Sequence, residues 1–159
     1  MPASLDIFDR LKQDHDLHRE LFAQLAASSS RERLLVKLTK ELKAHAAAEE
    51  QALYSTMMRK PETTSETRHS VAEHHEIEEL LNDLAAIDVD ADEWTDKLEA
   101  LRHRYIHHID EEEEEHFPDF ANYLTEDDLA HMRTVFERRK REEKAAAEVT
   151  PEALEDAKE

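Results

Sequence analysis

Apolar residues recur at alternating intervals of three and four along most of the chain, the spacing that places them on one face of an α-helix. Proline occurs only at positions 2, 61, 118 and 151, so long stretches contain no helix breaker. Small polar residues followed three positions later by an acid mark helix starts at Ser29, Thr63, Asp90 and Thr125. The pattern predicts five helices, over about residues 5–27, 30–59, 64–88, 92–117 and 126–145.

Four of these predicted helices have similar lengths and short connections, which is typical of an up-down-up-down antiparallel four-helix bundle. We therefore expect an all-α protein whose bundle occupies residues 1–120. Residues 121–159 are expected to add a short C-terminal fifth helix and, from about residue 145, a mobile or weakly helical tail. A chain of 159 residues with 39% hydrophobic content has the size of one domain.

Composition excludes several classes of protein. Without cysteine there are no disulfides, thiolate zinc sites or iron–sulfur clusters, and without glycine there is no P-loop or dinucleotide-binding turn. The net charge of −19 has the wrong sign for a phosphate backbone, so nucleic acid is not expected as a partner. No apolar run is long enough to span a membrane, and the N-terminus lacks the features of a signal peptide, so we expect a cytoplasmic protein without membrane contact.

In each of the four predicted bundle helices the apolar stripe runs into polar residues. These residues are His15, His45, Glu49, His74, Glu78, His108 and Glu112. In three helices the glutamate follows the histidine by four positions, which places both on one face about 6 Å apart. Counted from the turns at about 1.5 Å per residue, all seven lie within about one helical turn of a common level.

A single histidine or glutamate on an inward face is usually an ordinary hydrogen-bonded core residue. Four imidazoles and three carboxylates at one buried level instead indicate a multivalent cation, whose charge offsets the carboxylates. Seven nitrogen and oxygen ligands are too many for one tetrahedral zinc ion. They suit two first-row ions bridged by carboxylates, with iron or manganese as the first choices and zinc as a possible substitute.

At these residues the sequence resembles the hemerythrin-like, or HHE cation-binding, family of non-haem di-iron four-helix bundles. The matching segments are Asp14-His15, residues 45–50, residues 73–81, and residues 108–113 before Phe117-Pro118, and together they span about residues 5–120. The resemblance implies that His15, His45, His74 and His108 are terminal ligands and that Glu49 and Glu112 bridge two irons.

Two positions depart from the pattern of the oxygen-carrying hemerythrins. Glu78 stands where those proteins have a further histidine, and the last helix places Glu112, rather than an aspartate five residues on, after His108. An additional anionic ligand stabilises the ferric state, so these departures speak against reversible oxygen carriage.

The remaining polar residues have alternative readings. His18 is either an extra ligand or a core histidine, and Tyr105 either bonds to the centre or fills the core. His107 is expected to be exposed, although it replaces His108 as a ligand if its helix is rotated, and His116 lies near the bundle end. His69, His75, His103 and His131 are expected at the surface, most of residues 110–115 as a solvated acidic face, and the basic residues of 133–141 as partners of the acidic bundle.

Three functions fit this sequence. A di-iron centre could bind dioxygen, nitric oxide or peroxide in sensing or oxidative-stress defence, or it could break down hydrogen peroxide as a catalase-like enzyme. The third function is a metal-stabilised helical interaction module, for which no protein partner is predicted. The ferritin-like di-iron class is less expected, because it needs two Glu-x-x-His motifs and the one ending at His116 lies at a helix end.

Overall fold

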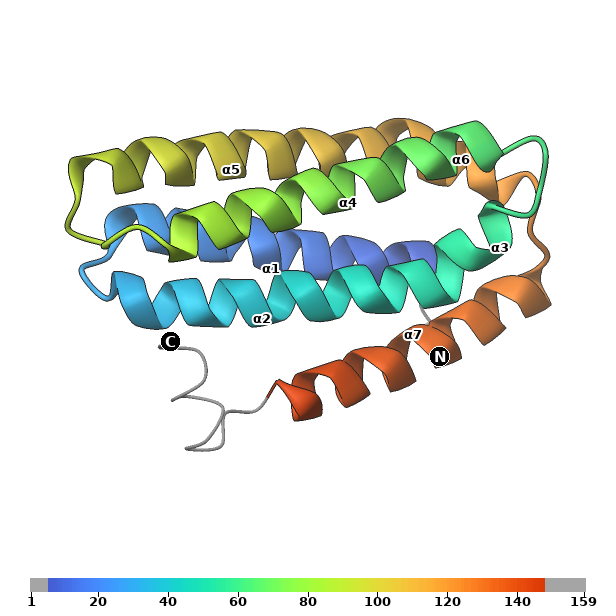
Figure 1. Ribbon diagram of the computed structural model, residues 1–159. Coiled ribbons are helices and arrows are strands. Elements are labelled where there is room, and N and C mark those ends of the chain that lie inside the picture. The colour runs from blue at the N-terminus through green and yellow to red at the C-terminus, as the bar shows by residue number, and fades with distance from the viewer. Residues whose placement is uncertain (1–5, 148–159) are drawn as a thin grey trace.

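The computed structural model describes residues 6–147, and every regular element in that range is helical (Figure 1). The helices are α1 (Ile7–Ala27), α2 (Arg31–Glu49), α3 (Ser55–Met57), α4 (Thr64–Ala85), α5 (Asp92–Glu111), α6 (Phe117–Ala121) and α7 (Glu126–Ala146), with the π-helices η1 (Glu50–Tyr54) and η2 (Glu112–His116). The predicted fold class is confirmed. The predicted starting residue 5 and the tail beyond residue 147 lie outside the described range.

The long helices α1, α2, α4 and α5 run alternately up and down and form the bundle, and α7 lies outside it along α2 (Figure 1). The predicted helices over 30–59 and 92–117 are each interrupted by a five-residue π-helix. The interruptions were not predicted, because a π-turn is built from ordinary helix-forming residues and adds no glycine or proline that would mark it. No helix among the described residues is long and apolar enough to cross a membrane.

The predicted start of the fifth helix is confirmed in atomic detail. The Asp128 amide donates to Thr125 Oγ1 over 3.1 Å, and the Thr125 amide donates to the Asp128 carboxylate over 2.9 Å, which is a complete capping box. The Thr63 hydroxyl instead donates to the Met57 carbonyl over 2.7 Å. That bond ties the loop before α4 to the end of α3, so Thr63 precedes the helix without capping it.

Two apolar clusters fill the bundle, one on each side of a polar layer. The first lies toward the α1–α2 and α4–α5 turns and includes Phe22, Leu38, Trp94 and Leu101. The second cluster lies toward the opposite end, and its members include Ile7, Leu11, Leu53, Met57, Phe117, Phe120, Met132 and Phe136. Because Met132 and Phe136 belong to α7, the fifth helix shares the core of the bundle, and the division of the chain at residue 120 stays a prediction.

The inward face of α4 differs from the one that the sequence predicts. The expected stripe passes through His74 and Glu78, but Glu78 is exposed. The buried residues of α4 are Thr67, Ser70, Glu73, Ile77, Leu81 and Leu84. This rotation is favourable because it removes Ile77 and Leu84 from water, whereas the predicted rotation would bury the Glu78 carboxylate instead. Three of the four predicted stripes are confirmed, and the expectation that Glu78 belongs to a buried layer is wrong.

Candidate metal centre

The polar layer between the two apolar clusters is formed by six of the seven predicted residues. His15 of α1, His45 and Glu49 of α2, and His108 of α5 are buried, as is Glu112 at the start of η2. His74 of α4 completes the set, with 8% of its side chain exposed. The described structure therefore brings together four imidazoles and two carboxylates from all four bundle helices.

The two carboxylates lie at the middle of this group, and each faces two histidines. Glu49 Oε1 is 3.1 Å from His74 Nε2 and 3.8 Å from His45 Nε2. Glu112 Oε1 is 3.1 Å from His108 Nε2 and 3.7 Å from His15 Nε2. Ligand atoms that share a first-row ion at bond lengths of about 2.0–2.2 Å are separated by roughly 3–4 Å, so these spacings suit metal coordination.

The atoms that face the middle of the layer lack hydrogen-bond partners. They are the Nε2 atoms of His15, His45 and His108, both carboxylate oxygens of Glu49, and Oε1 of Glu112. Leaving a buried polar atom without a partner costs about 1–3 kcal/mol, and more for a charged group. Bound cations would satisfy all of these atoms at once, so the residues present fit a metal centre.

Four outer carboxylates lie against the outer nitrogens of the same histidines, and those of His15, His45 and His108 are within hydrogen-bond distance. The oxygen-to-Nδ1 distances are 2.8 Å for Asp14 and His45, 3.4 Å for Glu50 and His74, 2.9 Å for Glu73 and His108, and 2.7 Å for Glu113 and His15. Each acid is next in sequence to one of the six central residues and contacts the histidine of a neighbouring helix. Carboxylates in this position orient a metal-binding imidazole and fix which nitrogen faces the ion.

Sequence reasoning did not assign roles to these four acids. An adjacent residue on a helix points about 100° away from its neighbour, so the spacing of the inward stripes does not select these acids, and Glu113 lies in the run predicted to be mostly a solvated acidic face. The available signal was that an acid directly precedes His15 and His74 and directly follows Glu49 and Glu112.

The two His-x-x-x-Glu pairs have opposite electrostatics in the metal-free protein. Burial lowers the pKa of His45 to about 3, despite the nearby Asp14. Burial acts in the same direction on His108, but Glu112 and Glu73 outweigh it and raise its pKa to about 9. Burial and the neighbouring Glu112 raise the pKa of Glu49, whereas His108 holds the pKa of Glu112 below its usual range against the effect of burial.

Each central carboxylate stands at the junction between an α-helix and a π-helix. Glu49 ends α2 immediately before η1, and Glu112 begins η2. The π-turn of η1 also places Tyr54 in the core, where its hydroxyl donates to Glu112 Oε2 over 2.6 Å. Single π-turns within α-helices occur frequently at functional sites. Tyr54 is a further site residue that sequence reasoning missed.

The C-terminal helix α7 contacts one of the outer carboxylates, Asp14, through a buried lysine side chain. Lys140 of α7 donates to the two Asp14 oxygens over 2.8 and 2.7 Å, and Asp14 in turn contacts His45. Lys140 also lies 3.2 Å from Glu41 Oε2, and Lys144 pairs with the other oxygen of Glu41. The predicted pairing of the basic fifth helix with the acidic bundle is therefore present at Lys140.

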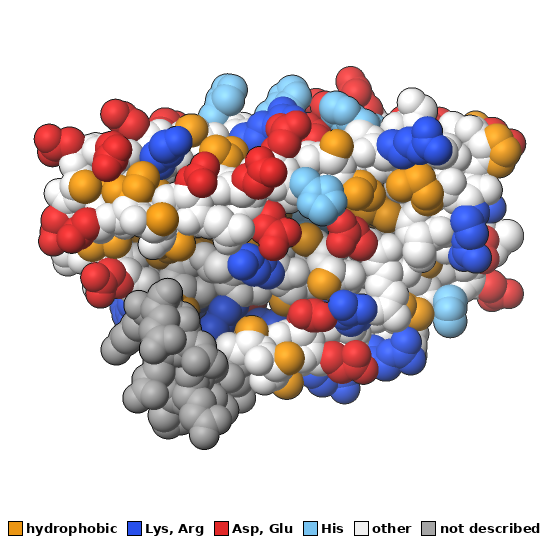
Figure 2. All heavy atoms as spheres, viewed as in Figure 1, with side chains coloured by type: hydrophobic (Ala, Val, Ile, Leu, Met, Phe, Trp, Pro, Cys, Tyr) orange, Lys and Arg blue, Asp and Glu red, His pale blue; other side chains and the backbone are white. Residues whose placement is uncertain are grey.

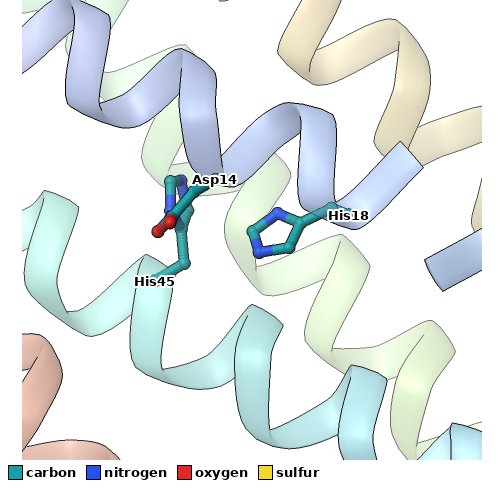
Figure 3. A group of neighbouring side chains, drawn as sticks. All are labelled: Asp14, His18 and His45. Carbon is teal, nitrogen blue, oxygen red and sulfur yellow. The ribbon is translucent and has the colours of Figure 1, made fainter. Parts of the chain in front are cut away.

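His18 lies beside the centre without facing its carboxylates. Figure 3 shows it next to His45 and Asp14, and the His18 and His45 ring centroids are 5.0 Å apart. Its Nδ1 is 2.6 Å from the Tyr105 hydroxyl, and its Nε2 is 3.6 Å from Glu41. His18 and Tyr105 are thus paired within the core. His18 also lies close enough to His45 and Asp14 for the three side chains to share a metal ion, and its Nε2 has no hydrogen-bond partner, so the two predicted roles of His18, extra ligand or core residue, both stay open.

The other histidines divide between the surface and a second cluster. His75, His103 and His131 are exposed, as predicted. His69 and His107 are also exposed but contact Glu111, and the buried His116 contacts the same residue. Since His108 is buried and His107 is 60% exposed, the alternative rotation of α5 does not occur.

A cavity of about 180 Å³ opens beside the centre between α2 and α4. Its walls include His45, His74 and Tyr105, and the small side chains of Ala46 and Ala47 leave it space. Glu50, His75 and Glu78 also line it. The cavity therefore connects two of the four central histidines to the surface, and Glu78 lies on its wall rather than in the buried layer.

This combination of a four-helix bundle with a central layer of histidines and shared carboxylates defines a helical metal-binding protein. The sequence profile of the hemerythrin HHE cation-binding domain matches residues 6–120, and the chain belongs to that family. An HHE cation-binding domain-containing protein from Mycobacterium kansasii has a similar crystal structure, with a TM-score of 0.79 at 19% identity over 90% of each chain. At that identity the likeness shows the fold.

One curated relative is a protein named DNA nickase from the cyanobacterium Nostoc sp. strain PCC 7120. It is 28% identical over 135 residues, which cover 83% of this chain and 38% of the relative. The chain therefore spans well under half the length of that protein.

Proposed function

We propose that the chain holds two first-row metal ions, iron before manganese or zinc, in the central layer. The ligands proposed are His15, His45, Glu49, His74, His108 and Glu112, with Glu49 and Glu112 shared between the ions. The observation that carries this proposal is the set of unpartnered inner atoms, which converge while carboxylates hold the outer nitrogens of His15, His45 and His108.

Two shared carboxylates follow from the symmetry of the contacts. Each carboxylate faces one histidine from the α1–α2 half of the bundle and one from the α4–α5 half. An ion in either half therefore reaches both glutamates, which is the arrangement of a bridged pair. A bound iron pair would supply one-electron redox chemistry and open positions for dioxygen, nitric oxide or peroxide.

The cavity and the two apolar clusters control which molecules reach this centre. The cavity of about 180 Å³ is large enough to admit dioxygen, nitric oxide or peroxide. The apolar clusters on both sides keep bulk water away from the layer. This geometry supports binding of a small oxidant or gas, in sensing or in defence against oxidative stress.

Hydrogen peroxide breakdown is the second candidate, and the cavity wall favours it. Glu50 and Glu78 both line the cavity next to His74. A carboxylate at that place can accept a proton from an entering peroxide and return it to the leaving oxygen. Gas binding alone requires no such proton acceptor.

We do not propose nucleic-acid chemistry for this chain on the basis of the name of the Nostoc relative. The net charge of −19 disfavours contact with a phosphate backbone, and the matched segment is a minor part of that relative.

The test is anaerobic iron loading followed by metal analysis and absorption spectra after separate additions of oxygen, nitric oxide and peroxide. We expect two irons per chain and a spectral response to at least one of the three. Sustained oxygen release from peroxide supports the enzyme, and a stoichiometric response without turnover supports binding or sensing. Two irons with no response to any addition indicates a metal-stabilised interaction module. One tightly bound zinc after iron-replete expression contradicts the proposed centre.

A further inference from the structure

A second group of metal-ligand side chains lies outside the central layer, on the face formed by α4, α5 and η2. Its centre is Glu111, the last residue of α5. Glu111 Oε1 is 3.1 Å from His69 Nε2 and 3.2 Å from His116 Nε2, and Glu111 Oε2 is 3.3 Å from His107 Nε2. Three imidazoles thus approach one carboxylate. Histidine and acidic side chains also gather along the edge of the molecule where α4 and α5 run (Figure 2).

We propose that His69, Glu111 and His116 form a second divalent-cation site, separate from the paired central ions. Ligand atoms around one zinc ion, at bond lengths of about 2.0–2.1 Å, are roughly 3.3 Å apart in a tetrahedron. The distance from each histidine to Glu111 matches that value. Glu111 forms one close group with His69 and Glu73 and another with His116 and Glu115, so the exposed His69 must turn toward His116 to complete the set. Two imidazole nitrogens and one carboxylate oxygen are a common ligand set for zinc, and the fourth position is open to water.

His116 is the best-prepared ligand of the three. It is 5% exposed, and its Nδ1 lies 3.2 Å from the hydroxyl oxygen of Ser70, which is itself completely buried. That contact directs Nε2 toward Glu111 and leaves it available to a cation, in the same way that carboxylates prepare the central histidines.

The π-helix η2 explains why Glu111 and His116 meet. They are five residues apart, and in an α-helix that spacing turns side chains about 140° away from each other. A π-turn pairs residues i and i+5, so the segment Glu112–His116 returns His116 to the face of Glu111. The turn that follows His108 therefore serves both sites. Regular helical counting from the sequence could not find this pair.

Neighbouring acids define which residues belong to the new site. Glu73 Oε1 is 3.4 Å from His69 Nε2, but Glu73 is committed to His108 at 2.9 Å and to Arg104 at 3.3 Å. Glu115 groups with Glu111 and His116 and is exposed, so it can supply a further oxygen. The side chain of His69 is 52% exposed, which gives an ion a direct route from solvent and lets His69 move toward it.

The experiment compares zinc bound per chain in full-length wild type and variants after equilibrium dialysis against micromolar zinc, with Co²⁺ absorption as a second readout. The chain is loaded with iron first. We expect one more zinc per chain in wild type than in His69→Ala or Glu111→Gln, or at least a tenfold weaker affinity in these variants. His103→Ala is the matched control, because His103 is an exposed histidine of α5 outside the cluster.

The new site and the central pair are tested separately by this design. His69 is exposed, so its substitution leaves folding and iron content intact, and only the additional zinc is lost. Circular dichroism of each variant checks the fold. Equal zinc binding by wild type, His69→Ala and Glu111→Gln overturns the second site whatever the iron content. Iron content below two per chain overturns the central pair instead.

Discussion

His45 on α2 and His108 on α5 occupy equivalent places, each four residues before a central glutamate and each followed by a π-helix. Their surroundings are opposite. The outer partner of His45 is Asp14, which α7 covers with Lys140, whereas the outer partner of His108 is Glu73, and Arg104 reaches it from the partly exposed side. One motif therefore sits on a flank closed by a fifth helix, and the other on a flank without that cover.

The same His-x-x-x-Glu motif therefore has different electrostatic properties in α2 and α5, because the surroundings of its histidine differ. Burial leaves His45 with a pKa of about 3, and the Glu112 and Glu73 carboxylates overcome burial to give His108 a pKa of about 9. The two equivalent histidines therefore differ in charge near neutral pH, with His108 protonated and His45 neutral.

Replacing either central carboxylate should abolish the paired centre. Both Glu49→Ala and Glu112→Ala are expected to lose both ions, because each glutamate faces histidines of both halves. Metal analysis after anaerobic iron loading measures this, and His75→Ala, an exposed histidine of α4, is the control that keeps two irons. Retention of one ion by either variant would show that the halves bind independently.

Removing the cation of the closed flank should weaken that half selectively. In Lys140→Met the Asp14 carboxylate loses two hydrogen bonds and keeps Arg10 at 2.6 Å, so we expect a loss of about 2–3 kcal/mol in the free energy of unfolding. We also expect about 10-fold weaker binding of the second metal equivalent, measured by titration.

Lys144→Met is the matched control for Lys140, because Lys144 pairs with Glu41 and is half exposed. An equal effect of both substitutions on metal affinity would show that α7 acts only through general packing and charge.

The closed flank should also respond to acid through Glu41. The imidazole of His18 close by, and then the nearby lysines of α7, hold the pKa of Glu41 below the ordinary value of 4.5 despite burial. A lowered folded-state pKa contributes stability above about pH 5 that is lost as the pH falls. Glu41→Gln should therefore be less stable than wild type at pH 7 by about 1–2 kcal/mol, with a smaller difference at pH 4.

Urea unfolding at the two pH values measures the response of Glu41. Glu79→Gln, exposed on α4, is the comparison on the other flank and should be neutral at both pH values. A constant difference between wild type and Glu41→Gln from pH 7 to pH 4 would contradict a stabilising charge at Glu41.

The smallest effect is expected at Glu78. Glu78→Ala should keep two irons and change stability by less than about 0.5 kcal/mol, because the side chain is exposed on the cavity wall. Metal analysis and thermal unfolding measure this. Loss of one iron in this variant would mean that α4 rotates on metal binding and brings Glu78 in as the ligand that the sequence predicts.

The sequence was sufficient for the helices and for most of the centre because three stripes contain large apolar residues at helical spacing. The stripe of α5, with Trp94, Leu98, Leu101 and Tyr105, allows one rotation only and therefore places His108 and Glu112 correctly. In α4 the aliphatic residues permit two rotations that differ by a fraction of a turn. The correct one depends on burying Ile77 and Leu84, which spacing alone did not decide.

The π-turns and the outer carboxylates were beyond sequence reasoning for a physical reason. Both depend on contacts between helices or on a local change of helical pitch, and neither leaves a breaker residue. Tyr54 illustrates this, because a regular α-helix through Glu49 would direct it elsewhere, whereas η1 brings its hydroxyl to Glu112.

The four outer carboxylates also link the bundle helices to one another. In α1 and α4 the acid precedes the central residue, as Asp14 and Glu73 do, and in the oppositely directed α2 and α5 extensions it follows, as Glu50 and Glu113 do. Because the helices alternate in direction, all four acids are displaced in the same rotational sense around the bundle axis. Each acid therefore lies against the histidine of the next helix in order, from α1 to α2, from α2 to α4, from α4 to α5 and from α5 back to α1. The four contacts form a closed ring that links each bundle helix to the next at the level of the centre.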